Sequence, residues 1–302
     1  MAILHSSLAA SALLLLSSTS LIARDEACRD MNSSDLKIYE KFWSSVTPEL
    51  TSNCILAGTP SNQINLWGFS ALSGAIEFSK NPDIVKTLLS KGADANLKGV
   101  IQSTHLHKAT KHNPFNEETD VIKLLLAAGA NLNATDEFGV TPLYWASLKS
   151  NPAVLKVLVK AGADVNARNE WGITPLHWAT DFVENPKVFQ ELLNAGANVH
   201  ARDEDGDTPI HWASSENDNR EVIRMLLEAG AKVDPVNADG DTPLHLAARN
   251  NEYSEVIMLL LKAGANSTAT NDTGETVFDL VKKNDALKGT EAYWALHDAK
   301  FK

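Results

Sequence analysis

The chain has 302 residues, of which 44% are hydrophobic and 22% are charged, a composition typical of folded protein rather than of a disordered chain. This length corresponds to roughly two ordinary domains, unless repeats make up the fold. The net charge of -11 argues against a nucleic-acid-binding protein, because phosphate contacts require clustered Lys and Arg. A basic or neutral partner is favoured instead.

The first 23 residues contain no Asp, Glu, Lys or Arg, and an apolar run extends from Leu8 to Leu16 before small polar residues. This pattern predicts a secretory signal peptide over residues 1–23, cleaved near Ser20 or Ala23. The run is shorter than the roughly 20 apolar residues that a membrane-spanning helix needs. We therefore expect export, to the periplasm or the exterior of the cell, and no stable membrane insertion after cleavage.

The two cysteines, Cys28 and Cys54, follow this leader directly. Export would place them in a compartment where disulfides persist, so a Cys28–Cys54 bridge is one interpretation. The other is that Cys54 is a free thiol buried as a small apolar residue.

A period of about 34 residues organises the rest of the chain. One landmark is the hexapeptide TPLYWA, TPLHWA, TPIHWA or TPLHLA, which begins at Thr141, Thr174, Thr208 and Thr242. Within such a unit the Thr suits a helix N-cap, the Pro suits the first turn, and an apolar stripe marks a second helix. A glycine then supplies the left-handed residue that ends this second helix. These glycines are Gly58, Gly92, Gly129, Gly162, Gly196, Gly230 and Gly264.

The repeated hexapeptide, followed by segments such as LVKAGADVN and LLNAGANVH, resembles the ankyrin-repeat family over roughly residues 33–302. The resemblance implies an all-α solenoid of stacked helix-turn-helix units, with β-hairpin loops along one edge. Each unit alone would leave one face of its apolar stripe in water, so neighbouring units must stack. The family also implies a binding scaffold and not an enzyme, with no cofactor and no catalytic residue.

Alignment of the units predicts four parts of the chain. The signal peptide occupies residues 1–23, and an N-terminal segment with a degenerate capping repeat follows at 24–66, with helices near 35–46 and 48–57. Six ankyrin repeats occupy 67–272, and a C-terminal capping repeat occupies 273–302, in which Trp294 and Ala295 align with the core residues Leu260 and Leu261.

The second repeat departs from the pattern. Gln102 replaces its turn glycine, and extra residues fall between its helices, within 111–119. This irregularity is either a recognition feature or an insertion that a surface loop tolerates.

The residues on either side of each turn glycine are the candidate binding site, because ankyrin proteins contact partners with these positions. Exposed apolar residues in a row are costly in water unless a partner covers them. We expect a protein partner, held along the concave hairpin-edged face by an apolar anchor and by acidic residues that orient a basic segment. The alternative is that the aromatic rings lie flat against the next hairpin. The apolar candidates are Trp67, Phe69, Phe138, Val140, Trp171 and Ile173, and the acidic candidates are Asp205, Asp207, Asp239 and Asp241.

Other chemically capable residues have structural interpretations. One repeat position carries His107, His177, His211 and His245, where the family uses the ring to bond neighbouring backbone. Trp145, Trp178 and Trp212 follow this position and are expected to pack between repeats.

Two groups raise the possibility of a metal site. His105, His107 and His112 lie close together, but no Cys or carboxylate completes a metal-ligand spacing. The acidic stretch DEDGD at 203–207 does not match the calcium loop with its terminal Glu. We expect no metal site.

The leading hypothesis is an exported, monomeric, non-enzymatic scaffold that binds a protein partner. The alternatives are a secreted effector that binds a host protein and a calcium-binding or metal-binding solenoid. An enzyme would need chemistry from a non-repeating patch such as residues 102–118.

Overall fold

The computed structural model describes residues 28–56, 60–79, 81–111, 119–148, 151–181, 186–215 and 220–300. The predicted signal peptide lies outside these residues, as do His112 and most of the extra residues of the second repeat. The chain divides into two compact units, residues 1–137 and 138–302.

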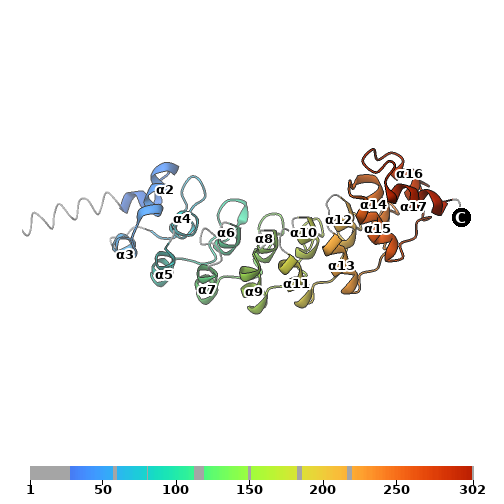
Figure 1. Cartoon of the computed structure of the whole chain (residues 1–302). Helices are drawn as coiled ribbons and strands as arrows, with labels where there is room; N and C mark the ends of the chain where they lie inside the picture. Colours follow the sequence, from blue (N-terminus) through green and yellow to red (C-terminus); the bar gives the residue numbers. More distant parts are fainter. Residues whose placement is uncertain are drawn as a thin grey trace, which may run out of the picture. The chain divides into compact units, whose positions relative to one another are not determined.

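The first unit contains three helix pairs (Figure 1). The first helices of successive pairs pack against one another, as do the second helices. Two short 3-10 helices, η1 (Asp30–Asn32) and η2 (Val100–Gln102), lie before the first pair and before the third. The pairs are α2 (Leu36–Ser45) with α3 (Pro48–Leu56), α4 (Ala71–Phe78) with α5 (Pro82–Ser90), and α6 (His105–Lys111) with α7 (Asp120–Ala127).

The second unit contains five pairs that stack in the same way (Figure 1). They are α8 (Pro142–Leu148) with α9 (Pro152–Lys160), α10 (Pro175–Asp181) with α11 (Pro186–Asn194), α12 (Pro209–Ser215) with α13 (Arg220–Glu228), α14 (Pro243–Asn250) with α15 (Ser254–Lys262), and α16 (Val277–Val281) with α17 (Glu291–Lys300). The described residues of the two units thus contain eight helix pairs.

The repeated hexapeptide starts helices as its residue types require. The Thr242 hydroxyl accepts a hydrogen bond from the backbone N–H of His245, and Pro243 occupies the first turn of α14. At the other end of a unit, Gly196 follows α11 with a φ of 85°, a conformation that suits glycine. Between these signals the apolar stripe is buried, as at Val188 and Leu192.

The loops between repeats turn as hairpins but form almost no sheet. Among the described residues the one bridge pairs Thr270 with Thr276. Asparagine side chains hold the turns instead: Asn169 Oδ1 accepts hydrogen bonds from the backbone N–H groups of Trp171 and Ile173, at 3.1 and 2.9 Å. The asparagine side chain thus accepts hydrogen bonds from backbone N–H groups that would otherwise pair with a neighbouring strand. The hairpin therefore lacks the backbone pairing of a β-ladder.

A disulfide joins Cys28 to Cys54, with their Cα atoms 5.1 Å apart. Both residues are buried, so Cys54 also contributes to the core of the N-terminal cap. The bridge fastens the segment before α2 to helix α3. The structure therefore has the disulfide and not the free Cys54 thiol of the other interpretation.

The alignment of the C-terminal cap was wrong. Trp294, expected in the core, is 55% exposed, whereas Ala292 and Leu296 are fully buried on α17. The segment between α16 and α17 buries Leu287 before α17 begins. This segment shifts the register of the last helix, so the 34-residue spacing no longer identifies its inward face.

No helix in the described part of the chain is both long enough and apolar enough to cross a bilayer.

Candidate protein-binding surface

In the second unit the residues immediately before the turn glycines, here called hairpin tips, form one row. The backbone carbonyl of each tip accepts a hydrogen bond from the N–H of the residue that precedes the next tip. The bonds run from Glu170 N to Phe138 O, Glu204 N to Trp171 O, Ala238 N to Asp205 O and Asp272 N to Asp239 O, at 2.9 to 3.1 Å. Because each bond joins neighbouring loops, the four tips follow one another in order.

Two aromatic tips stack on each other and remain accessible. The rings of Phe138 and Trp171 have centroids 6.0 Å apart and planes inclined by 20°. Phe138 is nevertheless 39% exposed and Trp171 is 48% exposed. The rings therefore lie against one another, as the packing interpretation expected, and still present a large apolar surface to a partner.

The residues that follow the turn glycines do not share this exposure. Val140 is only 6% exposed, so the expectation that it contacts a partner was wrong. Ile173 is half-buried. The Phe69 ring packs 5.6 Å from the Tyr39 ring and 4.3 Å from Lys108 Nζ. The reason is geometric: the hairpin reverses at the glycine, so the next side chain points toward the helices.

Two acidic tips, Asp205 and Asp239, are exposed as expected. The other two acidic candidates differ. Asp241 is buried and pairs with Arg249, so the expectation that it orients a partner was wrong. Asp207 is half-buried, and Asn237 Nδ2 donates a hydrogen bond to its Oδ1 at 2.8 Å. Burial raises the pKa of Asp207 to about 6, and the negative charges of Asp203, Asp205 and Asp241 add to this effect.

The first unit carries exposed apolar residues that the sequence interpretation missed. Trp67 is exposed as expected, and its indole Nε1 donates a hydrogen bond to Ser34 O at 2.8 Å. Leu66, Val100 and Ile101 are exposed as well. Counting three residues back from Thr104 would have identified Ile101 as the tip of the irregular second repeat.

The second-repeat loop is irregular in its backbone. Ile101 and Gln102 have φ values of 55° and 58°, although neither is glycine. A left-handed conformation is unusual for any residue with a side chain, and most of all for a β-branched one. Gln102 therefore adopts the conformation of the turn glycine that it replaces.

Two of the repeated histidines, His177 and His211, each join the start of a helix to the next hairpin. His177 Nδ1 accepts a hydrogen bond from the Thr174 N–H at 3.2 Å, and its Nε2 donates to the Asp207 carbonyl oxygen of the next hairpin at 3.1 Å. His211 makes the same pair of bonds to Thr208 and Asp241. Burial lowers the pKa of both rings to about 4, so they are neutral at pH 7.

Two histidines of the second repeat, His105 and His107, are also hydrogen-bonded, and His107 Nδ1 accepts the Thr104 N–H at 3.2 Å. His105 Nε2 lies 2.8 Å from Ser70 Oγ and its Nδ1 lies 3.3 Å from Ala95 O. No group of three or more His, Cys, Asp or Glu within the described residues has an arrangement that could hold a metal ion.

The tryptophans after the repeated histidines take part in ring packing. The Trp178 ring lies 5.2 Å from that of Tyr144 and 6.1 Å from that of Trp212. Trp212 Nε1 also donates a hydrogen bond to Asp203 Oδ2 at 2.8 Å. Unlike Trp171, these side chains are half-buried.

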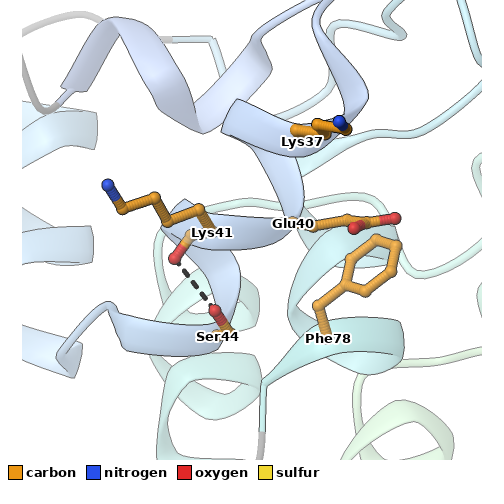
Figure 2. A pocket seen from close by; sticks show the side chains of 5 residues that line it. All are labelled: Lys37, Glu40, Lys41, Ser44 and Phe78. Atoms are coloured by element: carbon orange, nitrogen blue, oxygen red, sulfur yellow. Dashed lines mark hydrogen bonds between the residues drawn. The ribbon is translucent and has the colours of Figure 1, made fainter.

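A pocket of about 420 Å³ lies in the N-terminal cap and contains none of the candidate residues (Figure 2). Lys37, Glu40, Lys41 and Ser44 of helix α2 line it together with Phe78 of α4. Ser44 Oγ donates a hydrogen bond to Lys41 O within the helix, at 3.0 Å. None of these five side chains is fully buried, so the pocket offers no desolvated polar group that would select a ligand.

The family model described as ankyrin repeats (3 copies) matches residues 72–169, 106–203 and 176–271. The chain therefore belongs to the ankyrin-repeat family. It is similar to the crystal structure of the human ASB11 ankyrin repeat domain, with 28% sequence identity and a TM-score of 0.63 over 76% of this chain and 98% of that chain. No curated protein sequence matches the chain. Ankyrin repeats are generally protein–protein interaction scaffolds, and they bind protein partners.

Proposed function

We propose that this protein is an exported, non-enzymatic scaffold that holds a protein partner at the hairpin tips of its second unit. The observation that carries the proposal is the stacked and exposed pair Phe138 and Trp171. Exposed aromatic residues on a rigid scaffold are typical anchors of protein interfaces, since they bury a large area at a small cost in conformational entropy.

The acidic tips favour a partner with positive charge. Asp205 and Asp239 continue the row beyond Trp171, and both side chains are exposed. The net charge of -11 acts in the same direction, because it attracts basic proteins and speeds their association. The partner segment would therefore combine an apolar anchor with basic residues.

Two features support export. The sequence begins with a signal-like leader, and Cys28 and Cys54 form a disulfide. Disulfides persist in the periplasm and outside the cell and are rare in the reducing cytosol. A secreted effector that binds a host protein is a second form of the same proposal, since both would use the same surface.

The test is cross-linking of the tagged full chain in its own cells, followed by cell fractionation, purification and identification of the cross-linked protein. We expect the wild-type chain in an exported fraction, without its leader, joined to one main partner. The double variant Phe138→Ala, Trp171→Ala should lose the partner and keep its helical circular dichroism.

A matched control is Trp294→Ala, which removes a tryptophan of similar exposure from helix α17. This variant should retain the partner. Equal capture by the double tip variant would refute the assignment of the tips, and an unprocessed cytosolic chain would refute export.

A further inference from the structure

Asp207 belongs to an arrangement that the chain repeats. Asn237 of the next repeat donates its Nδ2 hydrogen bond to Asp207 Oδ1 at 2.8 Å. His177 of the preceding helix pair donates to the Asp207 carbonyl oxygen at 3.1 Å. Side chain and backbone of Asp207 are thus both held in place.

Thirty-four residues later the same arrangement surrounds Asp241. Asn271 Nδ2 donates to Asp241 Oδ1 at 2.8 Å, and His211 Nε2 donates to the Asp241 carbonyl oxygen at 3.1 Å. Asp241 differs in one respect, because Arg249 at the end of helix α14 binds both of its carboxylate oxygens, at 2.5 and 3.0 Å.

The next copy of the arrangement resembles that of Asp241 and not that of Asp207. Glu275 holds this position one repeat further on, and it pairs with Lys283, again eight residues later in the chain. At the equivalent place after Asp207 the chain has Ser215, whose hydroxyl accepts a hydrogen bond from Asn250. Of the three copies, Asp207 is the one that lacks an internal cation at this position.

No described residue forms the missing ion pair, although Arg202 lies nearby and donates to the Gly206 and Val236 carbonyl oxygens at 2.6 and 2.7 Å. Within that part of the chain no Lys or Arg pairs with Asp207, and residues 216–219, which follow Ser215, include neither type. His211 Nδ1 lies 4.0 Å from Asp207 Oδ1, but it accepts the Thr208 N–H hydrogen bond and is therefore not protonated.

The carboxylate is accessible and poorly compensated. The Asp207 side chain is 21% exposed, so a group from outside can reach it. The pKa of Asp207 is raised to about 6, first by burial and then by the negative charges of Asp203, Asp205 and Asp241. Its backbone N–H bonds to Asp203 Oδ1, whose other oxygen holds the Trp212 indole, so an aromatic ring adjoins the same network.

We propose that Asp207 is a binding site for a cationic side chain of the protein partner, arginine in particular, in the position that Arg249 fills on Asp241. This inference rests on the proposed function because it assumes that the cationic side chain belongs to a protein partner. Arginine fits because a planar guanidinium binds both oxygens of a carboxylate, as Arg249 does here.

The test is a titration of the full chain with acetyl-tetra-arginine amide at pH 7, with the citrulline analogue as the neutral control peptide. The readout is the NMR signal of the Trp212 indole N–H, which reports on the Asp203–Asp207 network. We expect the arginine peptide to shift this signal and the citrulline peptide to leave it unchanged.

Two variants remove the site in different ways. Asp207→Asn removes the charge, and Ser215→Arg supplies the internal cation that the other copies have. Each should weaken peptide binding about tenfold, the effect of one charge-assisted hydrogen bond. Circular dichroism checks that both variants fold.

Asp239→Asn is the matched control, since it removes one negative charge from an exposed tip of the next repeat. It should change the affinity less than about twofold, the size of a screened surface interaction. Equal losses in Asp207→Asn and Asp239→Asn, or none in Ser215→Arg, would overturn the proposal in favour of diffuse attraction. The double variant Phe138→Ala, Trp171→Ala should bind the peptide normally, because it leaves Asp207 unchanged. The assignment of the aromatic tips and the assignment of Asp207 are therefore tested separately.

Discussion

His177 Nε2 donates a hydrogen bond to the backbone carbonyl oxygen of Asp207, 3.1 Å away in the following hairpin. Because the other ring nitrogen accepts the N–H of Thr174, one neutral side chain joins the start of a helix to the next loop. The repetition of this bond at His211 gives histidine a structural role at this repeat position.

These rings should make stability depend on pH. Burial lowers the pKa of His105, His177 and His211 to about 4, below the value of about 6.5 expected in the unfolded chain. The unfolded chain therefore binds more protons between these values, and stability falls as the pH falls from 6.5 to 4. Each ring should contribute about 1.4 kcal/mol per pH unit in this window. Urea unfolding at several pH values measures the slope, which His211→Gln should reduce; an unchanged slope would contradict this assignment.

Ionisation of Asp207 should have the opposite effect on the pH dependence of stability. Its folded-state pKa of about 6 lies above the ordinary value of an aspartate, so the charged form destabilises the native state and stability is lost as the pH rises through this range. Asp207→Asn should raise the free energy of unfolding at pH 7 by about 1–3 kcal/mol and leave it unchanged near pH 3. A gain of equal size at both pH values would indicate that the amide stabilises for another reason.

The disulfide should stabilise the N-terminal cap. Cys28 and Cys54 are 26 residues apart, and closing a loop of this length contributes roughly 3 kcal/mol by restricting the unfolded chain. The double variant Cys28→Ser, Cys54→Ser should lower the free energy of unfolding by this amount in a urea titration. Dithiothreitol should reproduce the loss in the wild type and have no effect on the variant. A reductant-insensitive wild type would contradict the prediction.

Gln102 should be replaceable with a gain in stability. Its φ of 58° costs a residue with a Cβ atom roughly 1–2 kcal/mol, and glycine avoids this cost. Gln102→Gly should therefore raise the melting temperature, whereas Gln102→Ala, which keeps the Cβ atom, should not. Equal melting temperatures for the two variants would show that the loop relaxes without strain.

Much of this protein follows from local sequence. The Thr-Pro start of a helix, the apolar stripe and the terminal glycine act within one repeat, so they predicted the helix pairs and the family. Exposure of Trp171 at a tip and partial burial of Trp178 were predicted as well, because both positions keep their places in every regular unit. The repeat pattern was less informative at Gln102, where the turn glycine is replaced. It failed at the C-terminal cap, where the spacing changes and Trp294 is exposed to solvent.

What the tertiary structure alone decided is which side of each turn faces outward and which charges have partners. Val140 and Phe138 flank one glycine and are both apolar, yet one is buried and the other is exposed, since the hairpin reverses between them. Asp207 and Asp241 follow equivalent glycines and are the same residue type, but Arg249 neutralises only Asp241. The repeat sets the position of a residue, whereas exposure and charge balance depend on neighbours from other repeats, which a local pattern does not contain.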